Sequence, residues 1–153
     1  MRFAVSPKVV RIARRGASLW CAAAVGALLF SIRVATTIFE ELPADRMLAG
    51  RIAGRAFITA YAITLVAAVI AVGVVWVTRS NGSKLDRWIA GVLLVASVLE
   101  LFWVAPAITH HGAGWPGSFA SLHAVGGGVH LLLAVFALVL AWRLLDWVED
   151  GPR

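Results

Sequence analysis

Four long apolar segments make up most of this chain and leave few folds open to it. They cover roughly residues 17–39, 56–77, 88–108 and 119–145 of 153, in a composition that is 61% hydrophobic and 14% charged. Each segment reaches the ~20 residues that an α-helix needs to cross the hydrocarbon core of a bilayer. Backbone groups in lipid must be hydrogen-bonded within the protein, so we predict helices. The expected fold is all-α: residues 1–153 form a single integral, polytopic membrane domain, an antiparallel four-transmembrane-helix bundle.

Basic residues are distributed unequally between the two predicted ends of this bundle. One end has the tail of residues 1–15, the second loop and the C-terminal end, with ten Lys and Arg residues in all. The other end has three, Arg46, Arg51 and Arg55, in the first loop and none in the third. The positive-inside rule therefore predicts that both termini are cytoplasmic, in a multi-pass protein of the inner (plasma) membrane. Contact with anionic lipid accounts for the basic tail, so the lipid bilayer is the expected partner and nucleic acid is not.

Two titratable residues, Glu100 and His130, interrupt the third and fourth apolar segments. An ionisable side chain inside a membrane is costly and is usually tied to a partner or to a pathway. The helical rise places Glu100 about 20 Å and His130 about 22 Å from the cytoplasmic ends of their segments. We therefore expect the two side chains to share one depth and to form a pair, with Arg33 as a competing partner for the carboxylate.

Small and polar residues recur at spacings of three and four along two segments and mark their inward faces. In the fourth segment these are Ala120, His123, Gly127, His130, Ala134, Ala137 and Ala141; in the second they are Gly50, Gly54, Phe57, Tyr61, Thr64, Ala68 and Ala71. The Gly50/Gly54 pair is typical of a helix–helix contact. We predict the same packing role for Gly127, with space for a ligand as the alternative.

Local signals predict where two helices begin or bend. Asp45 is a suitable N-cap for a helix that continues into the second apolar segment. Pro106, followed by the glycine-rich connection 110–117, predicts a kink or an end of the third helix.

Polar residues on the predicted external side continue inward to the two mid-membrane residues. The candidate ion or ligand path consists of Arg33, Glu40, Asp45, Glu100 and His130. Such a funnel favours a transporter-like or metal/cation-handling protein whose polar site opens to the external face. The alternative is a network that only holds the helices together, as in a structural or accessory subunit of a larger membrane complex. A homodimer also stays open, because four short helices can hardly enclose a pathway alone.

The histidines suggest two kinds of cofactor. His110, His111 and His123 are suitable ligands for a transition metal, although their spacing matches no compact metal motif. Haem b, with His123 or His130 as an axial ligand, is the alternative, but the other three segments offer no histidine opposite them. No nucleophile–base–acid set and no nucleotide-binding glycine motif is visible, so the sequence does not favour an enzyme.

Three short motifs resemble a known family. They are VATTIFEEL at residues 34–42, AGRIAGRAF at 49–57 with Tyr61 shortly after, and FASLH at 119–123, seven residues before the polar side chain of His130. Together they resemble the transmembrane protein 205-like proteins, a four-helix family of unknown function, over about residues 19–145. The chain departs from that pattern at Thr36, Gly126 and His130, where proline, serine and asparagine are usual. The family is distantly similar to the copper-resistance-D-like membrane proteins, some of which handle copper or haem, which is a similarity of fold alone.

Overall fold

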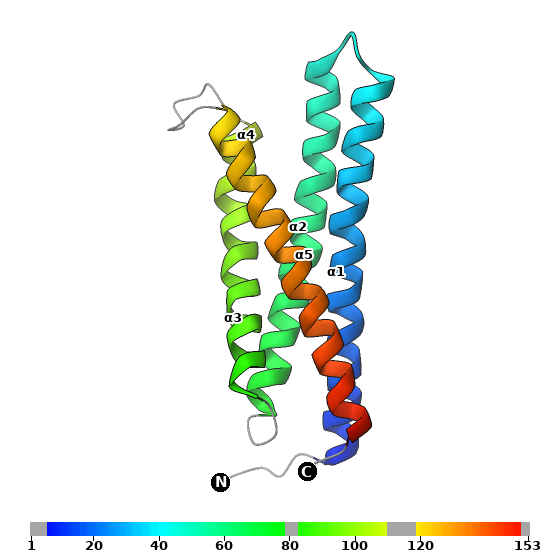
Figure 1. Ribbon diagram of the computed structural model, residues 1–153, viewed down its shortest axis with the longest axis vertical. Helices are drawn as coiled ribbons and strands as arrows, with labels where there is room; N and C mark the ends of the chain where they lie inside the picture. The colour runs from blue at the N-terminus through cyan, green and yellow to red at the C-terminus, as the bar shows by residue number, and fades with distance from the viewer. Residues whose placement is uncertain (1–5, 79–82, 110–118, 151–153) are drawn as a thin grey trace.

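The computed structural model describes residues 6–78, 83–109 and 119–150, and these residues form helices without any strand (Figure 1). The elements are α1 (Pro7–Glu41), α2 (Arg46–Val77), α3 (Lys84–Leu99), the π-helical turn η1 (Glu100–Val104), α4 (Ala105–Thr109) and α5 (Phe119–Asp150). Four stretches are long and apolar enough to cross a membrane: Pro7–Glu41, Arg46–Val77, Lys84–Ile108 and Ser121–Asp146. The predicted all-α, four-helix membrane bundle is confirmed. The cytoplasmic placement of the termini stays a prediction.

The first two helices extend well beyond the apolar segments that predicted them. α1 has 35 residues and α2 has 32, which at 1.5 Å per residue is about 50 Å each and exceeds the ~30 Å hydrocarbon core. The α1–α2 connection therefore projects past the rest of the bundle (Figure 1). At its base the side chain of Asp45 accepts a hydrogen bond from the Leu48 amide at 2.9 Å, which confirms the predicted N-cap of α2. We call this the hairpin end, and the end where α1 begins and α5 ends the basal end.

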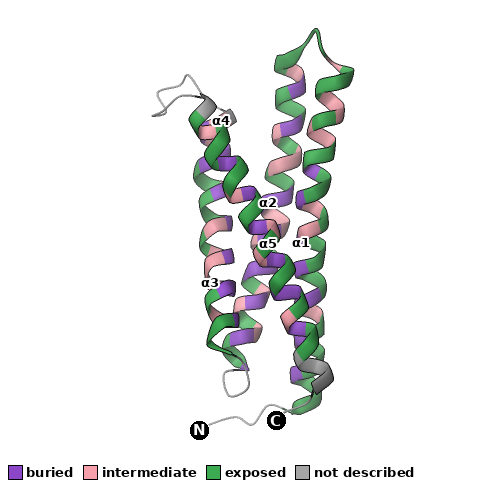
Figure 2. Cartoon of the chain, in the orientation of Figure 1, coloured by how far each residue is buried: buried purple, intermediate pink, exposed green. Residues whose placement is uncertain are grey.

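Small side chains let the helices approach closely along their inner faces. α1 makes its most extensive contacts with α2 and then with α5, while α3 lies against α2 and α5. Ala17, Cys21 and Ala24 of α1 and Ala68 and Ala71 of α2 have no exposed surface. Many large apolar side chains lie on the outward faces of the helices and are exposed. Exposed and buried positions alternate along each helix, as expected when one face of the helix points inward (Figure 2). This distribution fits a bundle surrounded by lipid, in which small residues face neighbouring helices.

The helix that follows Lys84 widens where Glu100 begins. The Ala105 amide donates to the Glu100 carbonyl five residues earlier, so the chain makes a π-helical turn before it resumes as α4. Pro106 follows directly. Proline lacks an amide hydrogen and its ring crowds the carbonyl four residues earlier, so a wider turn ahead of it relieves the clash. The kink or end predicted at Pro106 thus takes the form of a π turn that includes the intramembrane carboxylate.

A cluster of charged residues, here called the basal cluster (Arg14, Asp86 and Arg143), closes the basal end. Arg143 Nε donates to Asp86 Oδ1 at 2.5 Å, and its Nη2 donates to the Ser83 hydroxyl at 2.9 Å. Arg14 has no exposed surface and interacts electrostatically with the same aspartate. Nearby, the Ser18 hydroxyl donates to the Ala141 carbonyl at 2.8 Å. These contacts join α1, α3 and α5 across the end of the bundle.

Candidate functional site

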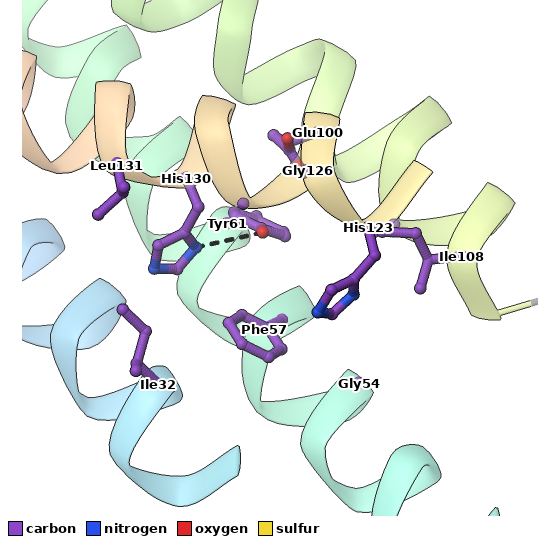
Figure 3. A pocket seen from close by; sticks show the side chains of 12 residues that line it. Ile32, Gly54, Phe57, Tyr61, Glu100, Ile108, His123, Gly126, His130 and Leu131 are labelled. Carbon is purple, nitrogen blue, oxygen red and sulfur yellow. Dashed lines mark hydrogen bonds between the residues drawn. The ribbon is translucent and has the colours of Figure 1, made fainter. Parts of the chain in front are cut away.

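The four spans surround a cavity of about 350 Å³ between the middle of the bundle and the hairpin end (Figure 3). All four contribute to it, and we call it the inner cavity. Its walls consist of Ile32 from α1; Gly54, Phe57 and Tyr61 from α2; Glu100, Ala105 and Ile108 from the third span; and His123, Gly126, Gly127, His130 and Leu131 from α5. Most of this wall is apolar. The polar groups that line it are therefore few and come from three different helices.

A second, larger cavity of about 850 Å³ adjoins the first on the side of the hairpin end. The two share Gly54, Phe57, Ile108 and His123 as lining residues. The outer cavity continues along α1 and α2 to charged side chains of both signs: Glu40, Arg46 and Arg51. Together the two cavities form one cleft that begins among charged residues and ends at an inner wall that includes Glu100, whose side chain itself has no accessible surface.

The imidazole of His130 is held on both sides by hydrogen bonds. Nε2 lies 3.1 Å from the carbonyl oxygen of Leu28 on α1, and Nδ1 lies 3.2 Å from the hydroxyl of Tyr61 on α2. A carbonyl oxygen only accepts, so Nε2 carries the hydrogen and donates it. The ring also contacts Phe57 edge-on, with centroids 5.3 Å apart at 85°. His130 is therefore fixed in orientation by three different contacts.

Glu100 is also buried, but it lacks hydrogen bonds like those that hold His130. Its side chain has no exposed surface, and neither carboxyl oxygen makes a hydrogen bond to any described residue. The Tyr61 hydroxyl lies within reach of the carboxyl group and interacts with it, but the geometry falls short of a regular hydrogen bond. A buried polar group without a hydrogen bond is unusual and costly. This carboxyl group is the least satisfied of the polar groups that line the cleft.

The Tyr61 hydroxyl links the protonation of His130 to the surroundings of Glu100. With a neutral imidazole, the hydroxyl donates its one hydrogen to Nδ1 and has none left for the carboxylate. With an imidazolium, Nδ1 donates to the hydroxyl oxygen, and the hydroxyl hydrogen is free to turn toward Glu100. The phenol can serve only one neighbour as a donor at a time. We therefore expect the protonation of the two groups to be coupled through Tyr61.

The structure brings some residues of the predicted path together and separates others. Glu100 and His130 line the same inner cavity, with Tyr61 between them, and Glu40 lines the outer cavity. Arg33 is exposed and lines neither cavity, and these two described residues, Arg33 and Glu100, form no ion pair. Asp45 is also exposed, with an oxygen engaged by the α2 amide described above.

Of the three predicted metal ligands, the structure describes His123 alone. His123 lines both cavities, and its ring points into the cleft from α5 (Figure 3). His110 and His111 lie outside the described residues. Within the described part of the chain, no group of three or more His, Cys, Asp or Glu side chains is placed to hold a metal ion. Both ring nitrogens of His130 are engaged in hydrogen bonds, so axial ligation of haem by His130 would require one of these hydrogen bonds to break.

The glycines differ in what their missing side chains allow. A Cβ at Gly126 would lie 3.1 Å from Ile108 Cδ1 and 3.2 Å from Val104 Cγ1, so α5 meets the third span closely there. A Cβ at Gly127 or Gly50 would meet nothing within 4 Å, and Gly54 lines both cavities. The close approach that we expected at Gly127 thus occurs one residue earlier, while Gly127 leaves space in the cleft.

Two aromatic residues at the centre of the site, Phe57 and Tyr61, were predicted only as part of an inward-facing stripe. Tyr61 is the one tyrosine in the chain, and a phenol inside a membrane span needs a polar partner. A tyrosine inside a span thus indicates that its hydroxyl has a hydrogen-bond partner, but it does not indicate which helix carries that partner. The partner depends on the rotation of α2, which is set by how the other spans pack.

The family model of a domain of unknown function, DUF4149, matches residues 19–113. Because the match covers more than half of the chain, this protein belongs to the DUF4149 family. No curated protein and no solved structure matches the chain. The matched residues include Tyr61 and Glu100, whereas His123 and His130 on α5 lie beyond them. These comparisons do not show the expected relationship to transmembrane protein 205-like or copper-resistance-D-like proteins.

Proposed function

We propose that this membrane protein handles cations in the manner of a transporter and that the cleft is its binding site. In this proposal Glu100 holds the positive charge. The observation that supports it most is the state of that side chain, which is fully buried, hydrogen-bonded to no described residue, and part of the wall of a cavity. A carboxylate in such a place needs a compensating charge. A cation that enters the cleft supplies it.

The asymmetry of the bundle supports a transporter-like role. The cleft reaches Glu100 from the hairpin end, while the basal cluster holds α1, α3 and α5 together at the other end. A carrier that exposes a mid-membrane site to one side at a time has this form in one of its states. If the termini are cytoplasmic, as the charge distribution predicts, the cleft opens to the external face.

A purely structural role is the second function that a specific observation favours. The contacts of His130 tie α1, α2 and α5 together, as expected of a network that fixes helix packing or of an accessory subunit. This reading does not explain why the carboxyl group of Glu100 is buried without a hydrogen bond. For that reason we favour cation binding.

A binding assay on the purified full-length protein in detergent tests the proposal. Na⁺, K⁺, Zn²⁺, Cu²⁺ and organic ammonium ions are each titrated while thermal unfolding is followed. A ligand at 100 times its Kd stabilises the folded state by about 2.7 kcal/mol. At least one of these cations should stabilise the wild type and lose its effect in Glu100→Gln. Glu41→Gln, which removes an exposed carboxylate at the hairpin end, is the matched control and should behave as the wild type.

The same preparation separates the alternatives. A visible spectrum with a Soret band would show bound haem and overturn the proposal, and elemental analysis would reveal a co-purified metal. Protein that is colourless, metal-free and stabilised by none of the cations would favour the structural role instead.

The direction in which the cleft opens is tested by thiol labelling in a Cys21→Ser background. Ala44→Cys at the hairpin end should react with a membrane-impermeant reagent added to intact cells, and Lys84→Cys at the basal end should not. The opposite pattern would place the mouth of the cleft in the cytoplasm.

A further inference from the structure

We infer that the cation taken up by this cleft is a lipophilic organic cation, a quaternary ammonium or phosphonium ion with an aromatic or branched apolar body. The inference rests on the proposed function and names the ligand class of the same site. It depends on what surrounds Glu100 and on where the inner cavity reaches the surface of the bundle.

The inner cavity offers one negative charge inside a mostly apolar wall. Metal ions require several oxygen, nitrogen or sulfur ligands, and no group of three His, Cys, Asp or Glu side chains is found among the described residues. An organic cation with a shielded charge needs no such ligand set. It requires a single counter-charge and apolar surface for its substituents, and Glu100 together with Ile108 and Leu131 provides both. The volume of about 350 Å³ falls within the range of about 300–1,000 Å³ that is typical of small-molecule sites.

Two aromatic rings lie on the route to that carboxylate. Phe57 and Tyr61 are stacked on one face of α2, with ring centroids 6.3 Å apart and an interplanar angle of 25°. Phe57 is half-buried and lines both the outer and the inner cavity, and His130 contacts it edge-on. Aromatic faces attract cations through the ring quadrupole. A cation that moves from the outer to the inner cavity therefore passes an oriented aromatic ring before it reaches the carboxylate.

The inner cavity also reaches the apolar outer surface of the bundle between α1 and α5. Ile32 and Leu131 line it, and they are 37% and 61% exposed. Gly127 of α5 lines the same cavity, and a Cβ there would meet nothing within 4 Å. In a membrane this surface faces lipid, which dissolves organic cations with large apolar bodies far better than hydrated metal ions. Both the wall and this lateral opening thus favour the same class of ligand.

Equilibrium binding of tetraphenylphosphonium to the detergent-solubilised full-length protein tests the inference, with tetraphenylborate as the matched anion of the same shape. Tetraphenylphosphonium should bind and tetraphenylborate should not. Glu100→Gln should weaken binding of the cation by about tenfold or more, the equivalent of about 1.4 kcal/mol. Phe57→Leu should weaken it by about threefold through loss of the aromatic face, and Glu41→Gln should leave it unchanged.

A second variant keeps the test decisive if Glu100→Gln fails to fold. Gly127→Leu places an apolar side chain in the cavity and leaves every charge in place, so it should abolish binding of tetraphenylphosphonium. Unchanged binding in this variant would contradict the inferred site.

The remaining outcomes separate this inference from the proposed function. Equal binding of the phosphonium and the borate, or binding that Glu100→Gln leaves intact, would show simple apolar partition and overturn the inference. Binding of Na⁺, K⁺, Zn²⁺ or Cu²⁺ that depends on Glu100, without binding of tetraphenylphosphonium, would overturn the inference while the proposed function stands. Absence of binding by any of these cations would overturn both.

Discussion

The basal end and the cleft of this bundle each contain a buried carboxylate, and the surroundings of the two carboxylates are opposite. At the basal end Asp86 accepts a hydrogen bond from Arg143 and interacts with the buried Arg14. In the cleft Glu100 is equally inaccessible but is hydrogen-bonded to no described residue. The first carboxylate is part of what holds three helices together. The second is a cost to the fold, and such a cost is typical of functional sites rather than of structural ones.

The contrast extends to the packing around each carboxylate. Near Asp86 the helices are joined by direct side-chain contacts, including the Ser18–Ala141 hydrogen bond. Around Glu100 the spans leave a cavity in which a Cβ at Gly127 would meet nothing within 4 Å, although α5 approaches the third span closely at Gly126. We infer that the basal end fixes the arrangement of the helices and that the cleft is built on that fixed base.

The largest effect is expected from disrupting the basal cluster. Asp86→Ala removes the partner of Arg143 and a carboxylate that interacts with the buried Arg14. Because Arg14 and Asp86 are both buried, losing this counter-charge costs about 3 kcal/mol. Unfolding in SDS or by heat measures the loss. Asp146→Ala, which removes an exposed carboxylate near the same end of α5, is the control and should have little effect. Equal stability of the two variants would mean that the basal cluster does not hold the bundle together.

In the cleft, replacing the buried carboxylate should increase the stability of the fold. Glu100→Met replaces the carboxyl group by an apolar chain of similar length and should stabilise the ligand-free protein by about 2 kcal/mol, because a buried polar group without a hydrogen bond is removed. The same replacement at His130 should be destabilising by a similar amount, since Leu28 and Tyr61 lose their partner. Unfolding of both variants in the absence of added cations provides the comparison. Destabilisation by Glu100→Met would indicate that the carboxylate already has a structural partner.

A smaller effect tests whether Tyr61 connects the two titratable residues. A double-mutant cycle of Glu100→Gln and His130→Leu should give a coupling energy of about 1 kcal/mol. In the Tyr61→Phe background the coupling should fall to near zero, because the phenol that relays it is gone. Coupling that persists there would mean that Glu100 and His130 interact directly, as the sequence alone suggested.

The smallest effect is expected at two adjacent glycines of α5. Gly127→Ala adds a methyl group in open space, so the better helix propensity of alanine should stabilise the protein by up to about 1 kcal/mol. Gly126→Ala must displace Ile108 and Val104 by a few tenths of an ångström and should lose most of that gain. Thermal unfolding of the pair measures the difference. A reversed order would place the close helix contact at Gly127.

The parts of the fold that depend on length and apolarity were predictable from the sequence. The four spans and the Asp45 cap follow from local physics that needs no knowledge of neighbouring helices. The extension of α2 back to Arg46 was predicted by the Asp45 cap and not by apolarity, because its first turns carry exposed arginines that end a hydrophobic segment without ending a helix.

The position of the site along the helices was predictable from the sequence, but the arrangement of its side chains was not. Equal depth brought Glu100 and His130 to one cavity, since depth depends only on helical rise. The insertion of Tyr61 between them, the outward position of Arg33 and the open space at Gly127 all depend on how each helix is rotated. A π turn shifts that rotation further, because it adds one residue within the third span.

Aqueous access to the cleft from one side alone is the central claim, and thiol labelling tests it most directly. In a Cys21→Ser background, Gly127→Cys lines the inner cavity, whereas Ala137→Cys lies on the same helix, fully buried and nearer the basal end. A small membrane-impermeant reagent added at the hairpin end should label the cysteine at position 127 and not the one at 137. Added at the basal end, it should label neither. Labelling of position 127 from the basal end, or of both positions equally from the hairpin end, would contradict a cleft that leads to Glu100 from one side.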